Sequence, residues 1–133
     1  MGDAVPPVPT PERPPRGPLV LVVEDEFLLA MDLGVLLERQ GYRVLGPAAT
    51  VAEALRLLDG GETPGAALLD VNLRGETVTP VAARLRALGV PFVLASAYDD
   101  ARLAALGLAG APNLGKPADD RRLLAALAEA VGR

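Results

Sequence analysis

The chain has 133 residues and a net charge of −4, and half of its residues are hydrophobic although few are aromatic. This length suits one domain with a core of leucine, valine and alanine, and the negative charge argues against general binding to nucleic-acid backbones. The absence of cysteine and histidine excludes disulfides, zinc–thiolate sites and any imidazole base. Because no apolar stretch approaches the roughly 20 residues of a membrane span and no signal peptide is evident, we expect a cytoplasmic protein.

The first 18 residues contain seven of the 13 prolines and almost nothing to bury. We expect residues 1–18 to form an extended, disordered leader and residues 19–133 to form the folded domain. Prolines in this leader have P-x-x-P spacing, which arises easily by chance in a proline-rich segment.

From residue 19 onward, short apolar runs alternate with amphipathic segments, a pattern typical of parallel βαβ units. We predict strands at residues 19–23, 43–46, 66–70 and 91–95, and a weaker fifth strand at 111–114. Five helices separate or follow these strands. The first is expected over 26–40, the fourth over 99–106 and the fifth over 119–131.

Local signals support several helix boundaries. In the first helix, leucines at positions 29, 33, 36 and 37 share a face, and Gly41 ends it. Thr50 and Glu53 have the spacing of a capping box at the start of the second helix. Thr79 is a candidate cap for the third helix, with Pro80 in its first turn.

Polar residues follow four of the predicted strands: Glu24 and Asp25, then Asp70, Ser96 and Lys116. Right-handed crossovers make such strands parallel, so these side chains share one edge of the sheet. In a doubly wound, flavodoxin-like α/β fold with strand order 2-1-3-4-5, a ligand crevice opens between strands one and three. The three carboxylates would line that crevice.

These residues together predict phosphoryl chemistry. Two unit charges about 4 Å apart repel by roughly 4 kcal/mol near a protein surface, so the carboxylates need a cation, and an all-oxygen site suits Mg²⁺. Lys116 is the single lysine beside twelve arginines, which indicates a narrow site for one anionic oxygen. With Ser96 as a further hydrogen-bond donor, we predict reversible formation of an acyl phosphate on an aspartate.

Four segments resemble the motifs of the response regulator receiver domain, in the right order, over about residues 18–132: Val22 to Glu26, Leu68 to Asn72, Ala95 to Ala97, and Gly115 to Pro117. The resemblance implies a CheY-like fold with five parallel strands and five helices. It implies that Asp70 is the phosphoacceptor and that Ser96 and Lys116 bind the phosphoryl group. It also implies that Mg²⁺ is held by Glu24, Asp25, Asp70 and the backbone carbonyl of Asn72.

The same resemblance implies the partners. Receivers take phosphate from a sensor histidine kinase or a histidine phosphotransfer protein, assist their own phosphorylation and dephosphorylation without being enzymes on other substrates, and change their contacts with a downstream protein. We expect no direct DNA binding and no membrane contact, and either a monomer or a phosphorylation-linked dimer. Since no DNA-binding or enzymatic segment follows, we expect a stand-alone receiver.

The switch residues depart from the usual receiver pattern. Receivers commonly have an aromatic residue three positions before the lysine, and here that position is Asn113. Residues 90–98 resemble the Pro-Phe-x-Phe-Ala-Thr-Gly-Tyr signature of the FAT GUY receivers, which lack that aromatic and are often stand-alone. Tyr98, together with Ser96, is therefore the candidate switch.

Two other functions fit parts of the sequence. A pseudo-receiver would be a phosphorylation-independent interaction module with a vestigial acidic pocket, which the full set of five polar residues disfavours. A phosphatase with an aspartyl nucleophile would need a second acid two residues after Asp70, where Asn72 stands.

Residues 110–116 match most of a P-loop, but Pro117 replaces its Ser or Thr.

Overall fold

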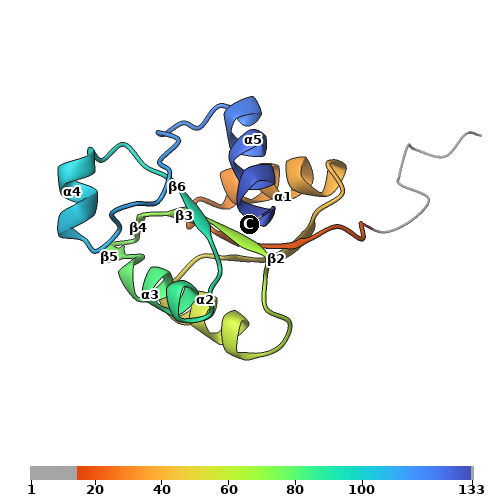
Figure 1. The fold of residues 1–133 in the computed structure, drawn as a ribbon, viewed down its shortest axis with the longest axis horizontal. Coiled ribbons are helices and arrows are strands. Elements are labelled where there is room, and N and C mark those ends of the chain that lie inside the picture. Colours follow the sequence, from red (N-terminus) through yellow and green to blue (C-terminus); the bar gives the residue numbers. More distant parts are fainter. Residues whose placement is uncertain (1–14, 133) are drawn as a thin grey trace, which may run out of the picture.

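The computed structural model describes residues 15–132, so most of the leader expected at 1–18 lies outside the described residues. A parallel sheet of four strands forms the centre of the molecule, in the order β2-β1-β3-β6 (Figure 1). The strands are β1 (Leu19–Val23), β2 (Arg43–Ala48), β3 (Ala66–Asp70) and β6 (Phe92–Ala95). The chain is therefore an α/β protein of the flavodoxin-like class, as predicted.

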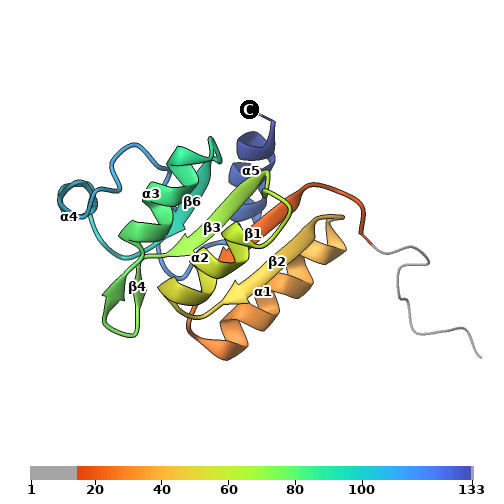
Figure 2. The same ribbon diagram turned by 90° about the horizontal axis from the view of Figure 1, so that it is seen from below.

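Helices cover both faces of this sheet (Figure 2). On one side lie α1 (Phe27–Arg39) and α5 (Asp120–Val131), and on the other α2 (Val51–Asp59) and α3 (Thr79–Ala87), while α4 (Asp100–Ala105) lies beyond β6. Alternate residues of β1 enter the two cores: Val20 packs on the α1 and α5 side, and Leu21 on the α2 and α3 side. All five residues of β1 are buried, which explains their continuous apolar run.

Capping explains where some helices begin. Thr50 caps α2, because its side chain accepts from the Glu53 amide at 3.1 Å, and Glu53 reaches back to the Ala49 amide at 2.7 Å. Thr50 is thus confirmed as the cap, while the Glu53 carboxylate bonds the amide one residue before the cap and not that of Thr50 as in a regular capping box. Thr79 is not the cap of α3, since Val78 occupies that position. The Thr79 hydroxyl instead donates to the carbonyl of Leu106 at 2.7 Å, a tertiary contact that connects α3 to the end of α4.

The predicted fifth strand is reduced to a single parallel bridge between Leu94 and Asn113. Leu94 donates to the Pro112 carbonyl and Leu114 donates to the Leu94 carbonyl, both at 2.8 Å, so the segment occupies the expected position beside β6. Gly110 and Gly115 flank it with φ values of 89° and 82°, and these left-handed turns end the extended geometry on either side. Pro112 lacks an amide hydrogen and is tolerated because this is an edge.

A short hairpin was not predicted. It pairs β4 (Asn72–Leu73) with β5 (Glu76–Thr77), directly after β3. Arg74 and Gly75 form its two-residue loop with φ values of 53° and 90°, the geometry that matches the twist of a hairpin. None of the helices in the described part of the chain is long and apolar enough to cross a bilayer.

Candidate functional site

Three carboxylates meet at the carboxyl ends of β1 and β3. These strands pair in parallel, with Val23 opposite Leu69, so the residues at and just beyond their carboxyl ends lie at the same edge. One oxygen from each of Glu24, Asp25 and Asp70 lies within 4.8 Å of the others. Glu24 and Asp70 are buried, with exposed fractions of 4% and 6%, and Asp25 is half-buried. The sequence predicted this convergence from strand order alone.

Lys116 forms ion pairs with both buried carboxylates. Its Nζ lies 2.9 Å from Asp70 Oδ2 and 3.6 Å from Glu24 Oε1. Burial alone lowers the pKa of Lys116, but the hydrogen bond and charge of Asp70, followed by those of Glu24, give a net rise. Lys116 is therefore held in its charged form between the two acids.

The surroundings of Glu24 favour the protonated form of its carboxyl group. Its pKa is raised from 4.5 to about 7, chiefly by burial; the amide of Glu26, which donates to Glu24 Oε2 at 3.0 Å, opposes this rise, the charge of Asp70 adds to it, and the charge of Lys116 opposes it. One ammonium cannot neutralise three clustered carboxylates. A hard divalent cation fits the donor set, because all three side chains offer oxygen ligands and Mg²⁺ prefers such ligands.

A cavity of about 280 Å³ opens beside these groups. Besides Asp25, Asp70 and Lys116, its lining includes Asn72, Ser96 and Tyr98. The structure thus brings Ser96, which is 5% exposed, to the same pocket as the carboxylates. The Ser96 Oγ accepts from the Tyr98 amide at 2.9 Å, and the ring of Tyr98 lies 4.8 Å from the guanidinium of Arg102 in α4.

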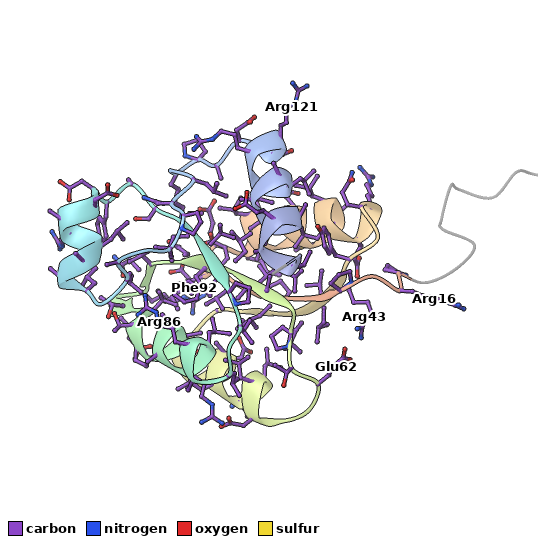
Figure 3. The ribbon with its side chains drawn as sticks, in the orientation of Figure 1. Arg16, Arg43, Glu62, Arg86, Phe92 and Arg121 are labelled. Carbon is purple, nitrogen blue, oxygen red and sulfur yellow. The ribbon has the colours of Figure 1, made fainter. Side chains whose placement is uncertain are left out.

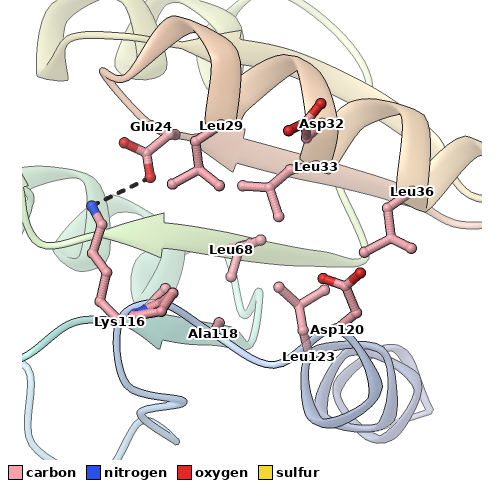
Figure 4. Close-up of a pocket in the computed structure, with 12 residues that line it drawn as sticks. Glu24, Leu29, Asp32, Leu33, Leu36, Leu68, Lys116, Ala118, Asp120 and Leu123 are labelled. Carbon is pink, nitrogen blue, oxygen red and sulfur yellow. Dashed lines mark ion pairs between the residues drawn. The ribbon is translucent and has the colours of Figure 1, made fainter.

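A second cavity, of about 310 Å³, runs between α1 and α5 from the Glu24–Lys116 ion pair (Figure 4). Leu33 of α1, Leu68 of β3 and Leu123 of α5 contribute to its apolar wall. Lys116 therefore lines both the polar pocket and this apolar cavity.

Two contributions to the site were missed by sequence reasoning. The Arg74 amide of the β4–β5 hairpin donates to Asp25 Oδ2 at 3.0 Å, so the hairpin positions that carboxylate. Asn113 stands where receivers commonly have an aromatic residue, and its sequence position does not predict its hydrogen bonds. Its Oδ1 accepts from the Ser96 amide at 3.0 Å, and its Nδ2 donates to the Tyr98 carbonyl at 3.1 Å. No periodic or motif signal encodes such loop contacts.

The response regulator receiver domain family matches residues 20–128, and the chain belongs to that family. Its fold agrees with solved receivers. The receiver domain of PhyR from Erythrobacter litoralis superposes with a TM-score of 0.76 at 26% identity, covering 86% of this chain and 90% of that one. A CheY-like receiver from Methanospirillum hungatei gives 0.76 at 25% identity, covering 86% and 94%.

Curated relatives are longer than this chain. The phyllosphere-induced regulator PhyR of Methylorubrum extorquens is 35% identical over 83 residues, which are 61% of this chain and 31% of that protein. The positive alginate biosynthesis regulatory protein of Pseudomonas aeruginosa is 36% identical over 115 residues, which are 84% of this chain and 46% of that protein. The chain thus spans less than half of the length of either relative.

Proposed function

We propose that this receiver accepts a phosphoryl group on Asp70 from a phosphohistidine of a sensor histidine kinase or a histidine phosphotransfer protein, and signals through altered protein contacts. The observation that supports this most is the cluster of Glu24, Asp25 and Asp70, which Lys116 pairs with and which borders the polar pocket lined by Ser96. These five polar residues come from four separate parts of the chain, and clustering three carboxylates has a large electrostatic cost that a purely structural role does not require.

Asp70 is the proposed nucleophile. Its carboxylate oxygen attacks phosphorus as the bond from phosphorus to the donor's imidazole nitrogen breaks, and the electron pair of that bond stays on the nitrogen. Lys116, already 2.9 Å from Asp70, neutralises one phosphoryl oxygen, and the Ser96 hydroxyl donates to another. When bound, Mg²⁺ would help to neutralise the charge of the phosphoryl group. The ligands proposed for it are Glu24, Asp25, Asp70 and the backbone carbonyl of Asn72.

The phosphodonor is proposed to dock on α1. Phe27 and Leu28 are 72% and 71% exposed, and Met31 and Val35 are half exposed along the same helix. Such an apolar surface on a protein of this size marks an interaction site. It begins two residues after Asp25, so a protein bound there can present a phosphohistidine to the acidic pocket.

The loop between β6 and α4 is proposed to transmit the effect of phosphorylation from the pocket to α4. Ser96 lines the pocket, Tyr98 follows two residues later, and the ring of Tyr98 contacts Arg102 of α4. A displacement of the Ser96 hydroxyl toward a phosphoryl group therefore moves groups attached to α4.

We propose the same pocket as the site of assisted dephosphorylation. The cytoplasmic location and signalling without DNA contact stay predictions.

The decisive experiment is incubation with acetyl phosphate and Mg²⁺, followed by intact-mass measurement. We expect the mass of one phosphoryl group to be added, and to be lost in Asp70→Asn or after chelation of the metal. The metal-free Asp70→Asn variant should melt no lower than the wild type, because Lys116 keeps its pair with Glu24 while one of three repelling charges disappears.

A matched control is Asp59→Asn, which also removes one carboxylate but does so at an exposed ion pair with Arg84 on the α2 and α3 side. It should label like the wild type. Absence of labelling in the wild type, together with no thermal shift from beryllium fluoride and Mg²⁺, would contradict the proposal and favour the pseudo-receiver.

A further inference from the structure

The side chain of Asn113 makes three hydrogen bonds to backbone groups, two of which cross to the segment that contains Ser96 and Tyr98. Its Oδ1 accepts from the amides of Ser96 at 3.0 Å and Gly115 at 3.3 Å, and its Nδ2 donates to the carbonyl of Tyr98 at 3.1 Å. A primary amide can accept and donate at once, so this one side chain satisfies groups of both kinds. Neither Phe nor Ala could replace these contacts.

The three backbone groups belong to the residues around the pocket. Ser96 lies in its lining, Tyr98 leads into α4, and Gly115 directly precedes Lys116. The backbone ladder between these segments stops at Leu94 and Leu114. Among the described residues, all hydrogen bonds between segments 95–99 and 113–118 are made by the side chain of Asn113.

Asn113 thereby fixes the hydroxyl of Ser96 in one place. The Ser96 amide is held by Asn113, and the Ser96 Oγ accepts from the Tyr98 amide at 2.9 Å, while the Tyr98 carbonyl is held by Asn113 again. One lone pair of the Ser96 Oγ thus accepts a local hydrogen bond, which helps to fix its position. Its hydrogen is free to donate to an anionic oxygen in the pocket.

Resting on the proposed function, we propose that Asn113 is a positioning residue that sets the Ser96 hydroxyl and the Lys116 ammonium at the separation needed to bind one phosphoryl group on Asp70. It touches neither the metal ligands nor Asp70 through any of these hydrogen bonds. It acts by holding the two loops together, and a small displacement of either group weakens binding strongly because both must meet the same tetrahedral anion.

The test measures binding of beryllium fluoride, a mimic of the phosphoryl group, to the full chain in saturating Mg²⁺. Asn113→Ala should weaken this binding by about tenfold, as the loss of well-placed hydrogen bonds does. The affinity for Mg²⁺ alone should stay within about twofold, because the carboxylates remain in place. That second measurement also reports whether the acidic pocket of the variant is folded.

Thr79→Val is the matched control. It removes a hydroxyl that bonds a loop carbonyl, that of Leu106, outside the pocket. It should cost a similar amount of thermal stability and leave the affinity for beryllium fluoride unchanged. An equal loss of affinity in Thr79→Val and Asn113→Ala would show a general effect on the fold and overturn the proposal.

A double-mutant cycle tests whether Asn113 acts through the serine. Ser96→Ala should also weaken beryllium fluoride binding, and the combined loss in the double variant should be less than the sum of the single losses, since both changes act on the contact made by the Ser96 hydroxyl. Fully additive losses, or wild-type affinity in Asn113→Ala, would refute the role of Asn113. Failure of the wild type itself to bind beryllium fluoride would instead refute the proposed function.

Discussion

Lys116 is shared by two buried carboxylates, at 2.9 Å from Asp70 and 3.6 Å from Glu24. This arrangement suits a compact ammonium, since the broader planar guanidinium of arginine needs two acceptors in one plane. We therefore expect Lys116→Arg to weaken beryllium fluoride binding by about tenfold although the charge is kept. The affinity is measured from the thermal shift of each protein at increasing concentrations of beryllium fluoride. Wild-type affinity in the variant would show that the single lysine has no special geometric role.

At the level of residues, the positions of the five polar side chains could be predicted because they depend on strand ends. A residue directly after a parallel strand must lie at the carboxyl edge of the sheet, whatever its neighbours are. The contacts of Thr79 and Asn113 could not be predicted in this way. Thr79 bonds a carbonyl 27 positions away, and Asn113 bonds residues 15 and 17 positions away, so both depend on the final packing of loops.

Among the elements, α3 supports the loop that leads to the edge segment. Arg86 donates to the carbonyls of Gly107 at 2.6 Å and Ala109 at 3.0 Å, and its guanidinium lies 5.3 Å from the ring centre of Phe92 in β6 (Figure 3). One side chain thus joins a helix, a strand and a loop. These contacts of Arg86 explain how residues 107–110 hold one conformation without regular secondary structure.

Arg86→Ala should loosen that loop more than it unfolds the protein. We expect a loss of about 1 kcal/mol in the free energy of unfolding, because Arg86 is exposed and water replaces part of its hydrogen bonding. Hydrogen exchange should become faster at the Leu94 and Leu114 amides, which hold the edge segment to β6. Arg84→Ala, which breaks an exposed pair with Asp59, is the control and should leave both amides protected. Equal protection in both variants would contradict this role of Arg86.

The elements whose observed bounds agree best with the prediction are those with strong local sequence signals. Strands at 19–23 and 66–70 have the predicted bounds, and α2 begins directly after its predicted cap, Thr50. The edge segment at 111–114 was overestimated because its apolar run does not reveal that flanking glycines take left-handed geometry. The β4–β5 hairpin was missed because strands of two residues are too short for an alternating pattern.

For the whole molecule, burial and charge oppose each other at one edge of the sheet. The parallel strands are covered on both faces, and this packing buries Glu24 and Asp70 along with the leucines beside them. Apolar packing therefore supplies the stability that offsets the clustered negative charge. A cation or a proton at this edge should then stabilise the entire fold, because either one binds the folded state more strongly than the unfolded chain.

That coupling gives a pH dependence whose sign follows from Glu24. Its pKa rises from 4.5 to about 7 on folding, chiefly through burial, so between these values the folded chain holds a proton that the unfolded chain has released. Raising the pH through this window lowers stability. From pH 5.5 to 7.5 the metal-free chain should lose about 2 kcal/mol from this group, seen as a melting temperature several degrees lower.

Lys116 adds nothing to this change, because its raised pKa places its titration at far higher pH. Saturating Mg²⁺ should restore the melting temperature at pH 7.5, since the proposed metal binds the ionised form of Glu24 and competes with its proton. Glu24→Gln should flatten the metal-free profile, because the amide neither binds nor releases a proton in this range. A Glu24→Gln profile as steep as that of the wild type would show that another group, and not the buried glutamate, links protonation to folding.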